Sequence, residues 1–388
     1  MSAYRISHIS AGLAAVVVGY SSAVILVIDA ARQAGATPDM VTSWLLVLGL
    51  GMGVSCILFS LWYKMPVVTA WSTPGAAFLI GAAADYTLPE VIGSFVVSAV
   101  FSIIVSQNRG LSRTIARIPP AIASAMLAGI LLPICLGVFT EAAVYPLQTV
   151  LFLAVYLLGS LFFPRYMMLM LLVLACVISF SMGVLDDVTV TTPSLIWVTP
   201  SFSLSATIGL ALPLFVITLL SQNLPGIAIH HAHGYKPDHN TVLSGLGVIQ
   251  LILAPFGGFT FNLAAITAAL CMGDDVDPKP GQRYRAAVVA GVGYLLMGAM
   301  ASVVVVVFLS MPPVVVHLLA GLALLATLQA SVVRAMETPE HRQAATLTLI
   351  CSASGVTLAQ LTAPVWGLAI GLLVVMMRAY PFRRHQNR

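Results

Sequence analysis

Two stretches of the sequence place prolines, glycines and polar side chains inside segments that are otherwise apolar. The first is MPVVTAWSTPGAA (65–77) and the second is APFGGFTFNLAAITAAL (254–270). A helix that begins in the middle of a membrane presents unpaired N–H groups and roughly half a positive charge at its first turn. Two such ends that face one another would bind an anion without any cationic side chain.

The first stretch has the pattern of an extended segment followed by a half-length helix. We predict that the extended part starts at Pro66 and that the helix begins at Thr73-Pro74-Gly75. Proline is favoured in the first helical turn, where its missing N–H would be unpaired in any case, and Ser72 or Thr73 can cap that turn.

The second stretch has the same order of features. The extended part is predicted from three residues, Pro255, Gly257 and Gly258. Thr260 or Asn262 would cap a half-helix that starts at about Leu263. Irregular backbone at membrane depth persists only where protein or a water-filled cavity satisfies its polar groups. Two breaks at matching places therefore indicate a central cavity rather than two independent kinks.

Other groups of polar residues give no support to an enzyme or a metal site. HHAHGYKPDH (230–239) has histidines at helical spacing but lacks Cys or carboxylate ligands at firm spacing, and we interpret it as a solvated loop. GDDVDPKPGQRYR (273–285) lacks the glycine and the terminal Glu of an EF-hand loop. The five cysteines are scattered without a CxxC pair, and neither a P-loop nor a nucleophile–base pair is evident. We therefore expect no metal, no cofactor and no enzymatic activity.

The composition identifies the class of protein that must position the two breaks. Hydrophobic residues make up 60% of the 388-residue chain and charged residues only 8%. A soluble domain needs more surface charge than that, so we predict an all-α polytopic membrane protein with about fourteen segments of ~20 residues. Its surroundings would be the lipid bilayer, and no nucleic-acid partner is expected.

The predicted spans fall into two sets of seven. The first set lies near 9–31, 41–62, 74–84, 90–107, 117–137, 146–162 and 166–184, and the second near 205–230, 241–254, 262–272, 286–310, 313–334, 343–358 and 364–378. With both termini in the cytoplasm, this arrangement leaves all but one of the 17 Lys and Arg residues on the cytoplasmic side, the exception being Arg32. Such a bias agrees with the positive-inside rule.

The two sets of spans resemble one another in sequence. IPPAIASAMLAGILL (118–132) is echoed by MPPVVVHLLAGLALL (311–325). Because each set holds an odd number of spans, the second copy must enter the membrane in the opposite direction. We predict inverted repeats over 1–185 and 200–380, which together with broken helices at matching positions are typical of a secondary transporter.

Three stretches of the chain resemble a known family. LWYKMPVVTAWSTPGAA (61–77), ALPLFVITLLSQNLPGIA (211–228) and FNLAAITAAL (261–270) are similar to sequences of the benzoate:proton symporter family, the BenE-type membrane transport proteins. The resemblance covers essentially the whole chain. It implies uptake of benzoate with a proton across the bacterial inner membrane, by a protein related in architecture to nucleobase transporters and sulfate permeases.

The same resemblance implies two spatial domains. A core domain would comprise 1–110 and 205–310, and a gate domain would comprise 115–185 and 312–380. In the related carriers the substrate lies between the two half-helices. Those carriers often form homodimers through the gate domain, so the resemblance implies a contact of that kind here.

Carried onto this chain, the resemblance implies a substrate site made from four segments. Its residues are Ser21 and Ser22, then Trp71, Ser72, Thr73 and Gly75, then Gln222 and Asn223, and finally Thr260, Phe261 and Asn262. The related nucleobase carriers usually have carboxylates where this chain has Gln222, Asn223 and Asn262. A carboxylate there would repel an anion, so its absence favours benzoate over a nucleobase. The ring of an aromatic acid needs an apolar slot, for which Trp71 is our first choice.

The residues alone do not identify the proton-coupling group. Asp29 is an acidic residue that falls within a predicted helix, near the outer end of the first one, and His317 in PPVVVHLLAGL (312–322) titrates in the useful range. We predict that His317 or Asp29 affects the pH dependence of transport. Coupling through the substrate acid itself, or through water, would need no residue at all.

Three classes of function are compared. A proton-coupled carrier predicts matching broken helices and gradient-dependent uptake, an anion channel predicts large uncoupled currents, and an intramembrane enzyme predicts a catalytic constellation. The two breaks favour a carrier. Its substrate would be benzoate or a similar small aromatic carboxylate, and the alternatives are another small organic anion or a nucleobase.

Overall fold

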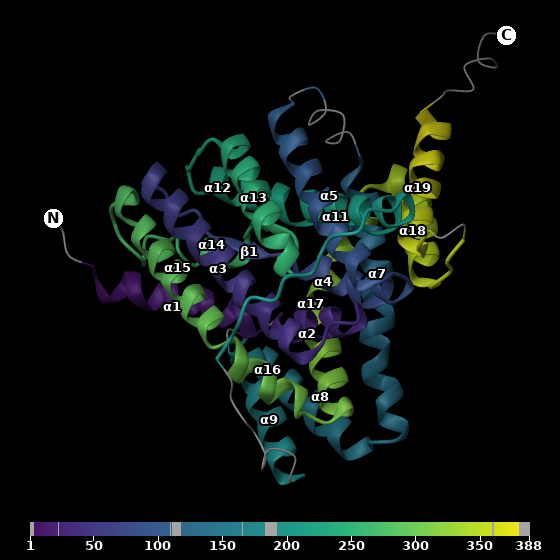
Figure 1. Ribbon diagram of the computed structural model, residues 1–388, viewed down its shortest axis with the longest axis horizontal. Helices are drawn as coiled ribbons and strands as arrows, with labels where there is room; N and C mark the ends of the chain where they lie inside the picture. The colour runs from purple at the N-terminus through teal and green to yellow at the C-terminus, as the bar shows by residue number, and fades with distance from the viewer. Residues whose placement is uncertain are drawn as a thin grey trace.

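The structure is a bundle of helices that surrounds two short strands (Figure 1). The computed structural model describes residues 4–21, 23–108, 110, 118–164, 166–182, 192–358 and 361–379. In this part of the chain, seven helical runs are long and apolar enough to cross a membrane: Ile6–Gln33, Pro38–Tyr63, Leu88–Gln107, Pro120–Ala143, Leu204–Ala232, His239–Phe256 and Pro313–Met336. The bent pair Pro280–Ala299 and Ala301–Leu309, with 59° between its arms, would add an eighth.

Each span predicted from the sequence contains helix in the structure. In the first half the helices are α1 (Ile6–Ser21), α2 (Val24–Gln33), α3 (Pro38–Tyr63), α4 (Thr73–Ala82), α5 (Leu88–Gln107), α7 (Pro120–Thr140), α8 (Pro146–Phe162) and α9 (Met167–Ser181). In the second half they are α10 (Leu204–Ala206), α11 (Leu212–Thr218), α12 (Leu224–Ala232), α13 (His239–Leu253), α14 (Ile266–Ala269), α15 (Tyr284–Ala299), α16 (Ala301–Leu309), α17 (Pro313–Met336), α18 (Arg342–Ala353) and α19 (Ala363–Ala379). The helical, multi-pass character is confirmed. The arrangement of about fourteen inverted spans stays a prediction, because several of these helices are shorter than the ~20 residues that cross a bilayer.

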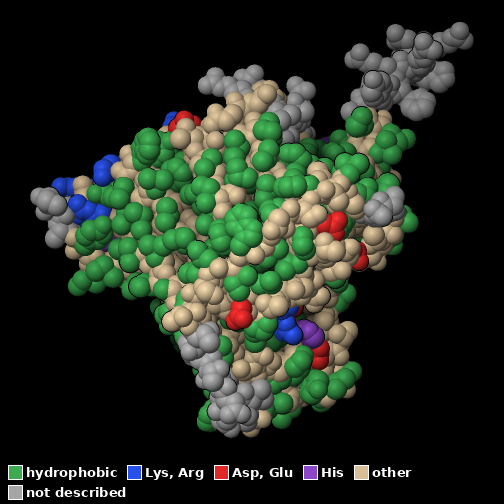
Figure 2. Space-filling view, in the orientation of Figure 1, with side chains coloured by type: hydrophobic (Ala, Val, Ile, Leu, Met, Phe, Trp, Pro, Cys, Tyr) green, Lys and Arg blue, Asp and Glu red, His purple; other side chains and the backbone are tan. Residues whose placement is uncertain are grey.

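The surface of the molecule suits a membrane. Apolar side chains cover most of the face drawn in Figure 2, and Lys and Arg side chains gather at the end nearest the N-terminus. Leu157, Leu161 and Trp62 are among many large apolar side chains that are more than half exposed. Such a surface is stable in lipid and would aggregate in water.

The run from α10 to α12 is interrupted by two π-helical turns, η3 (Thr207–Ala211) and η4 (Leu219–Asn223). Each turn lies just before a proline, Pro213 or Pro225. A proline inside a helix has no N–H to donate to the carbonyl four residues earlier, so the local hydrogen-bond pattern has to shift. Turns of this kind recur at functional sites, and η4 carries two of the predicted substrate residues.

The first break has the predicted form. After α3 the chain is extended from residue 66, pairs as strand β1 (Thr69–Trp71), and enters α4 at Thr73. Ser72 is the capping residue, because its Oγ accepts the N–H of Gly75 at 3.1 Å. The prediction of a half-length helix capped at this position is therefore confirmed.

The second break differs from its prediction. Pro255 lies in a 3₁₀ turn, η5 (Ala254–Phe256), and Gly257 with φ of 96° reverses the chain, so the extended part begins only after these residues. Strand β2 (Phe261–Leu263) follows, and α14 starts at Ile266 with Ala265 before it and no side-chain cap. The prediction that Thr260 or Asn262 caps this half-helix was wrong.

The strands explain that difference. β1 and β2 pair antiparallel with Thr69 opposite Leu263 and Trp71 opposite Phe261. The N–H of Ser72 donates to the Thr260 carbonyl at 3.0 Å, which extends the ladder. Thr260 and Asn262 therefore lie in the paired segment, so they cannot serve as helix caps. The two breaks are held together by backbone hydrogen bonds from segments nearly two hundred residues apart.

The helices around the strands pack in exchanged pairs. α3 packs on α15, and α5 packs on α13, while α7 packs on α17. In the predicted repeat, α3 corresponds to α13 and α5 to α15, so each pairing has a counterpart in the other half. The α3–α15 contact is close: a Cβ on Gly49 would lie 2.6 Å from Gly298 Cα, which only glycine permits.

Candidate functional site

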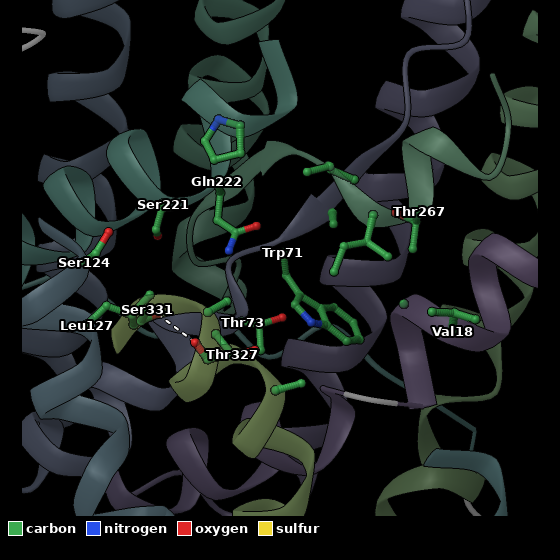
Figure 3. Close-up of a pocket in the computed structure, with 18 of the residues that line it drawn as sticks. Val18, Trp71, Thr73, Ser124, Leu127, Ser221, Gln222, Thr267, Thr327 and Ser331 are labelled. Carbon is green, nitrogen blue, oxygen red and sulfur yellow. Dashed lines mark hydrogen bonds between the residues drawn. The ribbon is translucent and has the colours of Figure 1, made fainter. Parts of the chain in front are cut away.

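A cavity of about 360 Å³ lies beside the two breaks. Its lining comes from α1, α3, β1, α4, α7, η4, α12, the start of α14, α15 and α17, and comprises Val18, Gly19, Met52, Ala70, Trp71, Thr73, Ser124, Leu127, Ser221, Gln222, Pro225, Ala264, Ala265, Ile266, Thr267, Tyr294, Ala326, Thr327, Ala330, Ser331 and Arg334. Trp71, Thr73 and Gln222 point toward the same space, and Ser124 and Ser331 lie on another side of it (Figure 3). The volume is in the range of small-molecule sites, ~300–1,000 Å³.

One wall of the cavity is aromatic. Trp71 is almost fully buried, and its ring lies 5.0 Å from that of Tyr20, centroid to centroid. The backbone N–H of Trp71 contacts the sulfur of Met52 at 3.2 Å. Burial and the contact with the Tyr20 ring restrain the indole, so it offers a rigid apolar face to a planar ligand.

The polar face of the cavity comes from the first turn of α4. Ser72 Oγ accepts the Gly75 N–H and also the hydroxyl of Thr218, at 2.9 Å. Pro74 has no N–H. Within the described residues, Thr73 is thus the first-turn residue whose N–H has no partner, and its hydroxyl also lines the cavity. The α4 terminus therefore offers fewer backbone donors than the sequence suggested, and side chains have to supply the rest.

The structure separates the predicted substrate residues into two groups. Trp71, Thr73 and Gln222 line the cavity. The described residues that do not line it are Ser21, Ser72, Gly75, Asn223, Thr260, Phe261 and Asn262, and Ser22 lies outside the described residues. Whether any of them binds substrate stays a prediction.

Most residues of the second group hold the breaks in place. Asn223 Oδ1 accepts the Leu263 N–H at 2.9 Å, and Asn262 Nδ2 donates to the Leu263 carbonyl at 3.0 Å. Phe261 is buried against Gly51, where a Cβ would lie 2.3 Å from its ring. The amides therefore satisfy irregular buried backbone, as such backbone requires.

Several lining residues were absent from the sequence prediction. Ser124 and Leu127 come from α7, and Thr327, Ser331 and Arg334 come from α17. The only signal in the sequence was the helical spacing of Thr327, Ser331 and Arg334 in an otherwise apolar helix.

The two predicted proton-coupling residues meet in a second cavity. Asp29 of α2 and His317 of α17 line a space of about 370 Å³ together with Arg32, Gln33, Leu309, Met311, Pro313 and Val316. His317 Nδ1 also lies 2.8 Å from Glu141 Oε1. Residues 288 positions apart (317 minus 29) thus share one polar site between α2 and α17.

The loop after α14 is tied to α1. His8 Nε2 donates to Asp277 Oδ2 at 3.0 Å, and Arg283 Nε donates to the Asp277 carbonyl at 2.7 Å. The N–H of Lys279, followed by His8 and Arg5, holds the pKa of the Asp277 carboxyl below its ordinary value. The stabilisation from this carboxylate is therefore present near neutral pH and is lost as the pH falls through its lowered pKa.

The histidine stretch 230–239 is less solvated than predicted. His230 is fully buried, donates Nδ1–H to the Gly226 carbonyl at 2.8 Å, and packs its ring 5.4 Å from that of His239. The interpretation as a solvated loop was wrong for His230, because α12 continues through Ala232 and directs this ring inward. In the described residues, no group of three His, Cys, Asp or Glu side chains is placed to hold a metal ion.

The sequence is similar to known proteins over nearly its whole length. The family model described as "Benzoate membrane transport protein" matches residues 2–377. The chain is 38% identical over 363 residues to the inner membrane protein YdcO of Escherichia coli (strain K12), with 93% of each chain covered. It is 34% identical over 382 residues to the benzoate membrane transport protein of Acinetobacter baylyi (strain ATCC 33305 / BD413 / ADP1), covering 97% of this chain and 96% of that protein.

The fold is similar to solved transporters of much lower identity. The murine Slc26a9 anion transporter in the inward-facing state aligns with a TM-score of 0.60 and 16% identity, covering 98% of this chain and 69% of that one. The transmembrane domain of the cyanobacterial bicarbonate transporter BicA aligns with a TM-score of 0.60 and 14% identity, covering 96% of this chain and 95% of that one. At such identities the likeness concerns the fold.

Proposed function

This chain belongs to the family of benzoate membrane transport proteins, and we propose that it imports benzoate or a similar small aromatic carboxylate together with protons. Membership of a transport family indicates a multi-pass membrane transporter rather than an enzyme. Import would proceed across the bacterial inner membrane, with both termini in the cytoplasm and the substrate site exposed to each side in turn.

The observation that carries this proposal is the cavity at the paired breaks. It combines the rigid face of Trp71 with hydroxyl and amide donors from Thr73 and Gln222. Among the described residues that line it, Arg334 is the only Asp, Glu, Lys, Arg or His, so none of them is an acidic side chain that would repel an anion. An aromatic carboxylate matches both parts, because its ring needs an apolar slot and its charge needs donors.

The lining of the cavity also bears on the alternative substrates and on the alternative of a channel. A nucleobase carries several donors and acceptors of its own and no full charge at neutral pH, so the basic, acid-free lining favours a carboxylate over it. Another small organic anion would satisfy Thr73 and Gln222 equally but would leave the indole face unused. An uncoupled anion channel would share the fold, and large currents in lipid bilayers would distinguish it from a carrier.

Packing between the helices supports the division into core and gate domains. α7, α8, α9, α17, α18 and α19 contact one another, and α3, α5, α13 and α15 form a separate set of contacts around the strands. The cavity lies between the two sets, since α7 and α17 line it on one side and the breaks on the other. The first set would be the gate domain and the second the core domain. Movement of one against the other would expose the cavity to one side of the membrane and then to the other, and a homodimer would form through the gate domain.

Asp29 and His317 are our candidates for proton coupling. Arg32 shares their cavity, and Glu141 lies 2.8 Å from His317, so both signs of charge face the two groups. The site joins α2 of the proposed core to α17 of the proposed gate. A proton bound there would change the attraction between the two domains.

The pH profile of uptake tests that assignment. Uptake is measured as a function of pH. In Asp29→Asn and His317→Ala proteins, the rise of uptake towards acidic pH should become less steep, and the pH at which this rise is half complete should change by about one unit. Asp39→Asn and His341→Ala are matched controls that lie outside the cavity and should keep the wild-type profile. Superimposable profiles for all four variants would dismiss both residues.

Radiolabelled benzoate uptake into proteoliposomes tests the function itself. An inward proton gradient should drive accumulation above the equilibrium level, and a protonophore should abolish it. Uptake without accumulation would point to a channel. Absence of uptake in protein shown to be folded would contradict benzoate as the substrate.

A further inference from the structure

The side of the cavity formed by α17 carries a feature that the two breaks do not explain. Five residues of this helix line the cavity, namely Ala326, Thr327, Ala330, Ser331 and Arg334. They recur at the spacing of one helix face, and the four before the arginine are small. The small side chains therefore leave space along this face of α17, and the face ends at the guanidinium group of Arg334.

Arg334 differs from the other polar groups on this face of α17. Ser331 is nearly buried, and its Oγ donates at 2.7 Å to the carbonyl of Thr327 in its own helix, so its proton is already used (Figure 3). Arg334 is exposed, and in the described residues no carboxylate lies within salt-bridge distance of it. An arginine keeps its charge at any physiological pH and binds carboxylates with two parallel N–H groups.

The position of Arg334 is also informative. It lies in the last turn of α17, at the end that the charge distribution predicts to face the cytoplasm. The fixed charge therefore lies at the end of the cavity that would face the cytoplasm, on the proposed gate domain, while Trp71 and Thr73 are on the proposed core domain. If the two domains move against each other, the guanidinium and the breaks line one cavity only when that cavity is open to the cytoplasm.

We infer that Arg334 recognises the substrate carboxylate on the cytoplasmic side and sets the affinity of the site in its inward-open state. The inference rests on the proposed function, since it assumes a carboxylate substrate. The site then has two affinities for one anion. From the outside, donors of the breaks alone bind the substrate, whereas on the inside the Arg334 charge adds to them and retains the anion near the cytoplasmic end of the cavity.

Sided exchange kinetics test this role. Radiolabelled benzoate exchange is measured in right-side-out and in everted membrane vesicles, which gives a KM for each face. Arg334→Gln should raise the KM at the cytoplasmic face about tenfold, as expected for loss of one charge-assisted hydrogen-bond pair, and leave the KM at the outer face unchanged. Arg334→Lys keeps the positive charge but loses the two parallel N–H groups, so its cytoplasmic KM should lie between those of the wild type and Arg334→Gln.

Lys236→Gln is the matched control. It removes one positive charge from an exposed residue that is not part of the cavity lining, so both KM values should equal those of the wild type. Raising the ionic strength should increase the cytoplasmic KM of the wild type more than that of Arg334→Gln, because salt screens an exposed charge.

The outcomes separate the two proposals. Wild-type exchange with an unchanged cytoplasmic KM in Arg334→Gln would overturn the role of Arg334 and leave the proposed function standing. An equal rise of KM at both faces would overturn the sidedness. Absence of benzoate exchange by the folded wild-type protein would overturn the proposed function, and the inference about Arg334 with it.

Discussion

Benzoate uptake should fall about 100-fold in kcat/KM when Thr73 is changed to Val and Gln222 to Leu in the same protein. Both side chains line the central cavity, and both replacements nearly keep the side-chain volume while removing the donors. A hydrogen bond to a charged group contributes about 1.5–3 kcal/mol, so two of them contribute at least ~3 kcal/mol, or two orders of magnitude. Each single variant should lose about tenfold.

The controls for this variant are the same two replacements elsewhere. Thr140 Oγ1 donates to the Gly137 carbonyl of its own helix at 3.0 Å, and Gln107 Nε2 donates to Ser244 Oγ at 3.0 Å. Neither residue lines the cavity, so Thr140→Val/Gln107→Leu should transport like the wild type. Initial rates over a range of benzoate concentrations, with equal amounts of folded protein, provide the comparison. Wild-type constants in the cavity variant would place the substrate elsewhere.

Gly257→Ala should strongly destabilise the folded protein. Gly257 has a φ of 96°, and a Cβ at this position would lie 1.8 Å from Cδ1 of Trp44. Trp44 cannot move away, because it is buried between Phe95 and Phe259, with ring centroids at 5.3 and 6.3 Å. The backbone strain costs about 1–2 kcal/mol and the overlap at least a further 1–3 kcal/mol. Together they are a large part of a typical stability of ~5–15 kcal/mol.

Two other glycine variants divide this effect into its parts. Gly35 also has a positive φ, of 84°, but a Cβ there meets no atom within 4 Å, so Gly35→Ala reports the backbone strain alone. Gly137 has neither a positive φ nor a near neighbour, and Gly137→Ala should leave stability unchanged or slightly improved. Thermal unfolding followed by size-exclusion chromatography in detergent ranks the three. A melting temperature for Gly257→Ala equal to that of Gly35→Ala would contradict the overlap.

The sequence determined the features that depend on neighbouring residues. Long apolar runs predict helices of membrane length wherever they occur, and all the predicted stretches contain helix. Pro74 after Ser72 and Thr73 predicts a capped half-helix, because capping and proline act within one turn. The family followed from short motifs such as TAWSTPGAA and SQNLPG, which need no knowledge of the fold.

The cap of the second half-helix could not be predicted from neighbouring residues. Thr260 and Asn262 have the right residue types for caps, and on propensity alone either would serve. Pairing with β1 takes precedence, because the strand backbone is buried and each of its N–H and C=O groups needs a partner. The partner strand consists of residues 69–71, and no residue close to Thr260 or Asn262 in the sequence indicates this pairing.

Only the tertiary structure placed α7 and α17 at the central cavity and brought Asp29 and His317 to one second cavity. Ser124, Ser331 and Arg334 look like ordinary polar residues in apolar helices, since their distance from Trp71 depends on how α7 and α17 pack against the breaks. Helix packing is decided by side-chain shape over whole interfaces, and no short stretch encodes it. The sequence therefore determined which segments carry the site, and packing between distant segments decided which side chains face the ligand.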